Sequence, residues 1–308
     1  MERVGNILLS IMSVVAYRTN SYAAGTYSVG SSVAITKPTG LAVNDLMLAF
    51  MSAYISAAAN PTITAPAGWT QLQTETIIHD SPSGRVTYTS FYKIAEAADV
   101  AASSFTFSSA AGADATGIQG SVSRFDGQEY EVVPVNASAD GGAGPVSTGS
   151  VSISGITPTV QSLLVMLVAS ANNASAQVPT TSTYAIATSN PSWTEAYDTG
   201  TAMNGTGISM AMAHASRPEL TATGNASASF DITVEGTYCQ IIALSPFINR
   251  PATLTASITM LAATIPVVVN GVLSILATIP SVVVDILAPT WKNQQKNSAD
   301  WENQDKST

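Results

Sequence analysis

Charged residues are scarce in this 308-residue chain. Lys, Arg, Asp and Glu together make up 10% of it, against about a quarter of an average soluble protein. Hydrophobic residues make up 46%, which excludes a disordered chain, because such chains combine high charge with low apolar content. The polar surface must therefore be built from Ser, Thr, Asn, Gln and Gly. A surface of this kind suits extended assemblies in which many subunits pack together.

Positive charge is the scarcer of the two signs. The chain has 11 Lys and Arg residues against 20 Asp and Glu residues, which gives a formal net charge of −9. Binding to DNA or RNA needs a basic surface that displaces counterions from the phosphates. We therefore expect no nucleic-acid partner.

Cysteine and histidine are almost missing. The single Cys239 excludes an intrachain disulfide framework and a cysteine-rich metal site, and its apolar neighbours predict a small buried side chain. His79 and His214 lie far apart and share no metal-ligand spacing. Acidic residues are scattered, except for a group between Asp126 and Glu131, and the common hydrolase, metalloprotease and phosphate-loop motifs are missing. The sequence therefore predicts no catalytic residue, no metal and no cofactor, and hence no enzyme.

The sequence from Ser13 to Phe247 has no sustained helical stripe. Short apolar runs alternate there with clusters of Gly, Pro, Asn and Ser. Residues 45–53 and 85–93 have the length and composition of strands, and 104–108 alternates with a period of two. This pattern predicts an all-β fold, a jelly roll or another β-sandwich.

The same order of segments occurs twice in this region. An apolar run, a Trp-Thr pair, a second apolar run, a Phe-containing strand and a closing run appear in residues 13–126 and again in 150–247. Residues 127–149 between them are rich in Gly and Pro and predict a connecting loop, which is also a candidate ligand-binding loop. The sequence predicts an internally duplicated sandwich, either two domains or two halves of one domain.

The first residues have several interpretations. Residues 6–16 have the apolar length of a secretory signal, but Glu2 offsets Arg3 in the segment before them. A second interpretation takes Met12 as the start of the chain. We favour a bound N-terminal arm made of residues 1–12.

Residues 252–288 are almost uncharged and contain a repeat with a period of 14. Residues 263–269 recur as 277–283, with a proline at the same phase. One interpretation is a membrane helix or hairpin, and the other is a β-rich shaft in which three chains bury these residues against one another. The prolines and the many β-branched residues favour the trimerisation shaft. The residues expected to make its contacts are Ile258, Leu261, Ile265, Val267, Val269, Leu273, Ile275, Ile279, Val282 and Val284.

The last segment, residues 289–308, is polar and repeats with a period of ten. Residues 291–296 return as 301–306. On a symmetric shaft, Trp291 and Trp301 would form successive oligomerisation layers. A docked arm and a flexible tail are the alternatives.

Five segments carry a likeness to a known family: Ala16-Tyr17-Arg18, residues 35–40, residues 44–50, residues 63–72 and residues 91–95. Together they resemble the jelly-roll, lectin-like β-sandwich module of structural proteins from tailed phages and prophages. The likeness covers residues 13–247, and the terminal repeats resemble extensions of phage tail and fibre proteins. The resemblance implies a virion component, homotrimeric when it carries a fibrous C-terminal part, and it transfers no active-site residue.

The sequence therefore predicts a non-enzymatic virion protein of the tail, tail tip or fibre. Assembly would take place in the host cytoplasm, with copies of itself and with other virion proteins, and a membrane location is disfavoured. A capsid decoration or head-fibre protein is one alternative. A carbohydrate-binding module for a host-surface glycan is another, and core packing is the competing interpretation of its aromatic residues. The side chains that would stack on sugar rings are Trp69, Trp193, Tyr88 and Tyr92.

Overall fold

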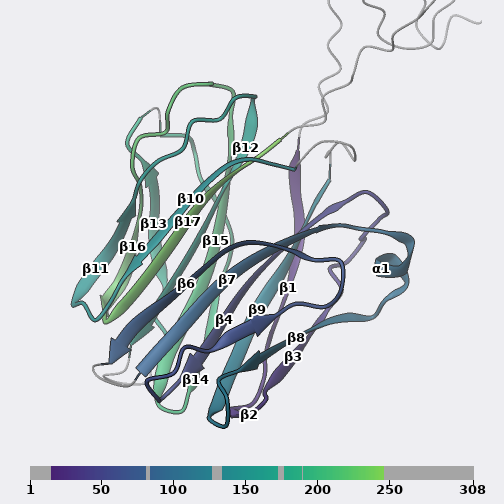
Figure 1. Cartoon of the computed structure of the whole chain (residues 1–308). Coiled ribbons are helices and arrows are strands. Elements are labelled where there is room, and N and C mark those ends of the chain that lie inside the picture. The colour runs from purple at the N-terminus through teal and green to yellow at the C-terminus, as the bar shows by residue number, and fades with distance from the viewer. Residues whose placement is uncertain (1–14, 81–83, 127–133, 173–176, 189, 246–308) are drawn as a thin grey trace, which may run out of the picture. The chain divides into compact units, whose positions relative to one another are not determined.

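The computed structural model describes residues 15–80, 84–126, 134–172, 177–188 and 190–245. These residues lie almost entirely in antiparallel strands, with one short helix, α1 (Ala97–Ala101) (Figure 1). The predicted all-β sandwich is confirmed for this part of the chain. The predicted arm, shaft and tail, with every residue expected to mediate oligomerisation, lie outside the described residues.

Residues 15–126 form a first sandwich and residues 134–245 a second. The strands of the first are β1 (Ala16–Ala24), β2 (Ser28–Val29), β3 (Ser32–Thr36), β4 (Leu46–Ile55), β5 (Thr62–Thr64), β6 (Thr70–Asp80), β7 (Gly84–Ile94), β8 (Ser104–Ala110) and β9 (Ala115–Asp126). The strands of the second are β10 (Val135–Ala143), β11 (Thr148–Ile153), β12 (Ser162–Asn172), β13 (Thr181–Ile186), β14 (Thr194–Met203), β15 (Thr206–Arg217), β16 (Ala226–Val234) and β17 (Gly236–Leu244).

Each sandwich pairs a large sheet with a three-stranded sheet. In the first, the large sheet has the order β1-β9-β4-β7-β6, with β2 also paired to β9, and the small sheet has the order β3-β8-β5. The first and last strands are neighbours, and successive strands mostly alternate between the two sheets. This is the connectivity of a jelly roll.

The second sandwich repeats the strand order of the first. Its sheets run β10-β17-β12-β15-β14 and β11-β16-β13, so that β1 corresponds to β10, β6 to β14 and β9 to β17. The irregularities repeat as well. The register shifts between Gln71 and Gln73 on β6 and between Glu195 and Tyr197 on β14, and β1 and β10 each have a bulge near the start. The internal duplication thus extends to the bulges, which bend the strands at the same places.

Three apolar cores separate four layers of sheet. One core lies between the two sheets of the first sandwich and includes Met47 and Phe107, and its counterpart in the second sandwich includes Met166 and Phe230. The third core lies between the two large sheets and includes Phe50. The large sheets are therefore the inner layers, buried on both faces, and every residue of β4 and β12 is buried. This burial explains why both strands have continuous apolar sequences instead of an alternating pattern.

The described part of residues 127–149, where the sequence predicts a connecting loop, contains a full strand instead. Strand β10 occupies Val135–Ala143, pairs with β17 and lies against β6 of the first sandwich. A Cβ atom at Gly142 would lie 2.5 Å from both the carbonyl oxygen of Thr237 and Cδ1 of Ile77. Glycine is present here because the strands approach closely, and the sequence interpretation mistook it for a turn residue.

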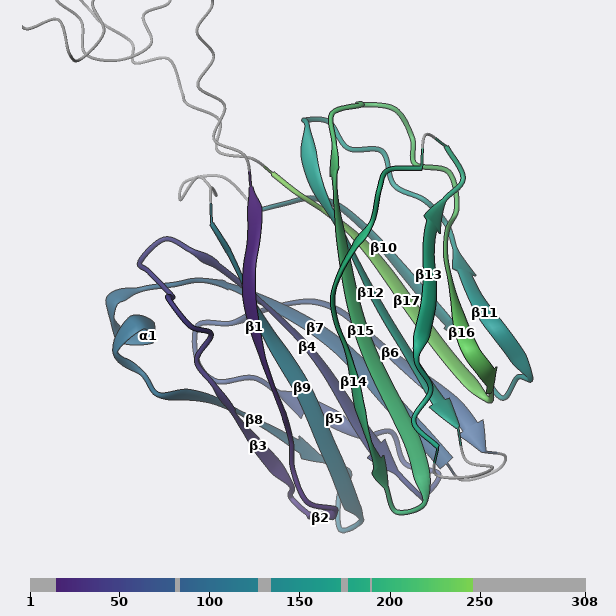
Figure 2. The same cartoon turned by 180° about the vertical axis from the view of Figure 1, so that it is seen from behind.

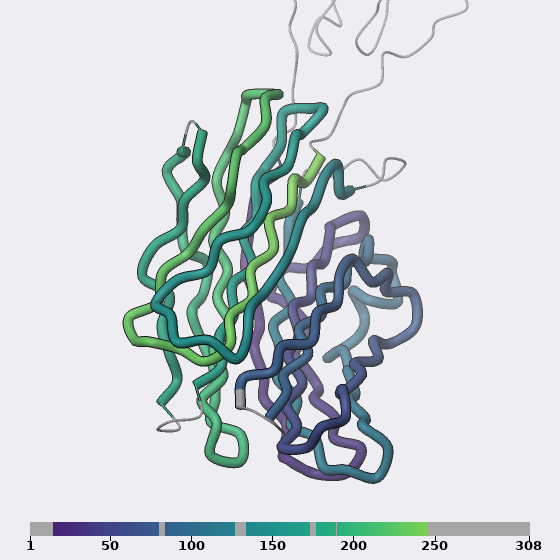
Figure 3. The backbone as a smooth tube through the Cα atoms, turned by 60° about the vertical axis from the view of Figure 1, so that its left-hand side comes forward, coloured from purple at the N-terminus to yellow at the C-terminus, as the bar shows by residue number. Residues whose placement is uncertain are grey.

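The two inner sheets meet with opposite edges apposed. Strand β1 lies against β14, while β6 lies against β10 and β17. Since β1 corresponds to β10 and β6 to β14, the two contacts are related by a pseudo-twofold axis, as in an isologous dimer. Figure 3 shows the two sandwiches beside each other.

The described chain enters and leaves at one end of the inner sheets. The ring of Tyr17, near the start of β1, lies 4.9 Å from that of His214, near the end of β15. At the end of β17, Leu244 pairs with both Val135 and Leu163. We call this the terminal end. The end of β6, where Asp80 pairs with Gly84, and the end of β14, where Met203 pairs with Thr206, lie at the opposite, distal end (Figure 2).

Candidate functional site

Tyr88 and Tyr92, two of the four aromatic residues predicted to stack on a ligand, face the second sandwich. The side chain of Tyr88 is fully buried, and its ring stacks on Tyr238 at 5.3 Å and lies 6.3 Å from Phe50. The stacking prediction is therefore wrong for Tyr88, because both faces of its sheet are covered. Tyr92 is half-buried at the border of the same core.

Trp69 and Trp193 occupy equivalent positions, immediately before β6 and β14. Both are half-buried. The Trp69 ring meets Phe105 and Phe107 edge-on at 5.7 and 5.4 Å, and Trp193 Nε1 donates a hydrogen bond to Asn190 Oδ1 at 3.0 Å. Because the two tryptophans belong to different sandwiches and Tyr88 is in the core, the structure does not gather the four aromatic side chains into one site.

The residues that carry the family resemblance around Trp69 hold a turn, a strand and a helix together. Gly68 has a φ of +84°, and a Cβ atom there would lie 3.1 Å from Cε of Lys93. The Lys93 ammonium lies 2.7 Å from Asp99 Oδ1, and Asp99 Oδ2 accepts a hydrogen bond from the backbone of Glu96 at the start of α1. Gly68, Lys93, Ile94 and Glu96 line a shallow depression of about 350 Å³. These side chains stabilise local structure.

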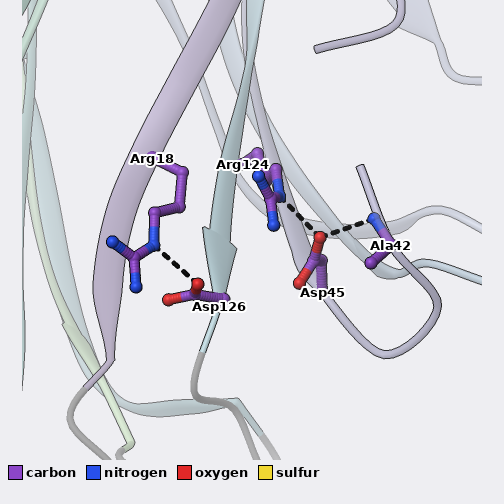
Figure 4. A network of polar contacts seen from close by, with 5 residues as sticks. All are labelled: Arg18, Ala42, Asp45, Arg124 and Asp126. Atoms are coloured by element: carbon purple, nitrogen blue, oxygen red, sulfur yellow. Dashed lines mark hydrogen bonds and ion pairs between the residues drawn. The ribbon is translucent and has the colours of Figure 1, made fainter. Parts of the chain in front are cut away.

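Ion pairs brace the terminal end. Arg124 Nε lies 2.6 Å from Asp45 Oδ2, which also accepts a hydrogen bond from the backbone of Ala42 at 2.7 Å (Figure 4). Arg18 Nε lies 2.6 Å from Asp126 Oδ2. The Arg124 pair is largely buried and the Arg18 pair is more exposed. Together with the Lys93 pair, these are all the ion pairs among the described residues, and all lie on the first sandwich at its terminal end.

Polar side chains also enter the interface between the inner sheets, at two edges. The neutral edge, where β1 lies against β14, consists of Tyr22, Gln119 and Thr199. Tyr22 Oη donates to Gln119 Oε1 at 2.6 Å, and Gln119 Nε2 donates to the Ile208 carbonyl of the second sandwich at 3.1 Å. Burial raises the pKa of Tyr22 to about 12, although interaction with Thr199 lowers it in part. This edge is uncharged, and Gln119 bridges the two sandwiches.

The acidic edge, where β6 lies against β10 and β17, consists of Glu75, Tyr88, Asp140, Tyr238 and Gln240. Glu75 is directly opposite Tyr88 on the neighbouring strand, and Asp140 is directly opposite Gln240. Since directly opposed residues share one face of a sheet, both carboxylates face the space between the inner sheets. Tyr238 Oη donates a hydrogen bond to Gln240 Oε1 at 3.4 Å. Burial raises the pKa of Tyr238, and the charges of Asp140 and Glu75 raise it further.

The two carboxylates of the acidic edge are poorly compensated. Burial raises the pKa of Glu75, and the charge of Asp140 raises it further. Burial also raises the pKa of Asp140, although the Tyr238 hydroxyl and a backbone N–H lower it in part. Within the described residues, no Lys or Arg contributes to either shift. Gln240 Nε2 and Tyr88 Oη are buried without a hydrogen-bond partner there. Such an edge is suited to hold a proton or to accept hydrogen bonds.

Asp198 is a second perturbed acid, next to the neutral edge but on the other face of β14. Burial raises its pKa to about 6, and Glu195 and Asp231 raise it as well, while a hydrogen bond from the Thr181 backbone lowers it. Asp198 Oδ1 is buried and has no partner in the described part of the chain. Among the described residues, Asp198 and the acidic edge are the two places where carboxylate pKa values are clearly raised.

The described residues contain neither a cluster of metal-ligating side chains nor a membrane-spanning helix. No group of three or more His, Cys, Asp or Glu side chains in the described ranges is placed to hold a metal ion. Cys239 is fully buried in the core of the second sandwich, as predicted, and burial raises the pKa of its thiol. None of the helical residues that the structure describes forms a segment long and apolar enough to cross a membrane.

Sequence reasoning missed the acidic edge. Glu75 counted as one of many scattered acids, and Asp140 fell within the predicted loop. The available signal was the alternation of Gln73, Glu75 and Ile77, which places a carboxylate in line with an apolar position. Comparisons with known proteins add no relative that would identify this edge: no family model, no curated protein and no solved structure matches the chain.

Proposed function

We propose that this chain is a non-enzymatic structural protein of a bacteriophage virion, a tail, tail-tip or fibre component that assembles as a homo-oligomer through residues 252–288. One observation carries the proposal. The described chain enters near Tyr17 and leaves after Leu244 at the same end of the inner sheets. A self-associating segment that follows would hold the double sandwich by its terminal end and leave the distal end free.

The buried faces of the sandwich support the same role. Both inner sheets are covered on both sides, and the core between them joins the two halves across the pseudo-twofold interface. A body built in this way is stiff, because packed cores do not deform continuously. The low charge of the chain and its resemblance to phage modules point in the same direction.

Carbohydrate stacking by the predicted aromatic residues fits this arrangement less well. Trp69 precedes the start of β6, where Thr70 pairs with Tyr92, and Trp193 precedes Thr194, which pairs with His214. Both tryptophans therefore lie at the terminal end, on the side of the attached segment. A host-surface contact at the distal end would use other residues.

The mass of the full-length protein in solution tests the proposal. We expect light scattering to give a homotrimer for the full chain and a monomer for a chain that ends at Phe247, with both showing the same β-sheet circular dichroism. In the full chain, Ile265→Asp and Ile279→Asp should each weaken the trimer. A full-length protein that is monomeric, or that stays in solution only with detergent, would contradict assembly through residues 252–288.

A further inference from the structure

The two carboxylates of the acidic edge belong to different sandwiches. Glu75 is on β6 of the first sandwich and Asp140 is on β10 of the second, and these strands lie against each other. Both side chains are half-buried. A group of like charges on both sides of an interface favours separation of the two sides when the charges are not compensated.

The fold does not require carboxylates at these positions. Counting from the equivalent bulges, Glu75 on β6 corresponds to Thr199 on β14, and Asp140 on β10 corresponds to Tyr22 on β1. At these two equivalent positions, the neutral edge has the hydroxyl groups of Thr199 and Tyr22, and the acidic edge has carboxylates. The same backbone arrangement is therefore compatible with uncharged side chains. Packing does not require the two carboxylates, which make the interface sensitive to ionisation.

We propose that Glu75 and Asp140 form a proton-controlled latch between the two sandwiches, closed while one carboxylate is protonated and loosened when both are ionised. A protonated carboxyl group donates a hydrogen bond that an ionised one cannot, and it removes the repulsion across the interface. Protonation therefore tightens the contact between β6 and β10. The latch is a property of the sandwich pair and does not depend on the role proposed for the whole chain.

The other titratable groups around the pair come from the strands packed against it. Strand β7 contributes Tyr88 and β17 contributes Tyr238, while Cys239 lies on the opposite face of β17. Burial raises the pKa of each of these three groups, which keeps them neutral between pH 4 and pH 8. Further along β6, His79 packs on Tyr54 with ring centroids 5.5 Å apart.

The sign of the pH dependence follows from the direction of the shifts. Each carboxylate has a higher pKa in the folded chain than in the unfolded one, so folding takes up protons as the pH falls. The stability that the latch contributes is fully present below the ordinary carboxyl pKa of roughly 4. It is lost as the pH rises through the raised values.

Thermal unfolding of the full-length protein between pH 4 and pH 8 tests the latch. Glu75→Gln should raise the unfolding midpoint at pH 8 by on the order of 2–4 °C, and the gain should shrink to nothing near pH 4. Asp140→Asn should do the same. Glu219→Gln is the matched control, because Glu219 is exposed in a loop, and its profile should follow that of the unchanged protein. Asp198 is present in all these chains, so its titration cancels in the differences.

Amide hydrogen exchange gives a second, local measurement. Exchange in β10 should be faster at pH 8 than at pH 5, after correction for the intrinsic rate, and Glu75→Gln should abolish this difference. The latch would be overturned if the two variants follow the Glu219→Gln profile, or if exchange in β10 is independent of pH. It would also be overturned if millimolar Ca²⁺ at pH 8 stabilises the unchanged protein but not Glu75→Gln, since the pair would then be a cation site.

Discussion

The neutral and acidic edges occupy equivalent places in one pseudo-symmetric interface, yet they differ in their polar side chains and in the hydrogen bonds that these make. At the neutral edge, Gln119 uses both ends of its amide, accepting from Tyr22 and donating to the carbonyl of Ile208. At the acidic edge, Gln240 is buried with its Nε2 unpaired among the described residues, beside carboxylates with raised pKa values. Two copies of one fold have therefore kept the backbone and diverged in the side chains that join them.

The two edges contribute unequally to holding the sandwiches together. A buried polar group stabilises a fold when all its hydrogen bonds are made and destabilises it when they are not. At the neutral edge, Gln119 meets this condition at both ends of its amide, whereas Ser121 Oγ, opposite Tyr22, is buried without a partner among the described residues. Gln240 at the acidic edge does not meet it, so we infer that the apolar core and the neutral edge supply the cohesion while the acidic edge opposes it at neutral pH.

The largest expected effect comes from the close approach of β10 at the acidic edge. Gly142→Val would place Cβ 2.5 Å from the Thr237 carbonyl oxygen, and we expect the free energy of unfolding to fall by about 3 kcal/mol. Ala24 is the corresponding residue of β1 and is exposed, so Ala24→Val should change the same quantity by less than about 0.5 kcal/mol. Urea unfolding of both variants makes the measurement, and equal losses would show that the two edges are packed alike.

Substitution of Gln119 and of Gln240 should have smaller and unequal effects on the free energy of unfolding. Gln119→Leu leaves the Tyr22 hydroxyl and the Ile208 carbonyl without their partner, which should cost about 2 kcal/mol of unfolding free energy. Gln240→Leu removes an amide whose nitrogen is unpaired and should cost less than about 0.5 kcal/mol, or stabilise the fold. The comparison fails if chemical denaturation gives Gln240→Leu the larger loss.

The smallest effect concerns Asp198, which faces away from the interface and so tests whether pH dependence is confined to the acidic edge. Its pKa is raised to about 6, so ionisation opposes folding above that pH and has no effect below roughly pH 4. Asp198→Asn should raise the unfolding free energy at pH 7.5 by at most about 1 kcal/mol, because the side chain is only partly buried.

The gain from Asp198→Asn should disappear when the same unfolding titration is made at pH 4. A gain of equal size at both pH values would mean that the aspartate acts through shape and not through charge. Combined with Glu75→Gln, the variant should give additive effects, because the two side chains lie on different faces of different sheets.

The sequence predicted the strands of the inner sheets well and their surroundings poorly. The apolar runs that correspond to β4 and β12 indicated strands, and the repeated Trp-Thr pairs indicated the duplication. Gly141-Gly142 was interpreted as a turn, because glycine required by a close strand contact looks the same in a sequence as glycine required by a loop. One of the two contact partners of Gly142, Ile77, lies in the other sandwich.

The candidate site was beyond sequence reasoning for a related reason. The alternating sequence of β7 places Tyr88 on one of the two faces of the strand. It does not show that a second sheet covers that face. Glu75 and Asp140 come together because the pseudo-twofold packing apposes β6 and β10. Their proximity depends on how the two halves dock, which neither periodicity nor local propensity encodes.

The shared terminal end has a mechanical consequence. A pull transmitted through the chain would enter at β1 and leave at β17 on the same side of the molecule, so tension would not have to cross the length of the sandwiches. The double sandwich would lie to one side of the line of force, and its distal end would carry no tension. The ion pairs formed by Arg18 and Arg124 lie at this end, where tension would enter the sandwiches.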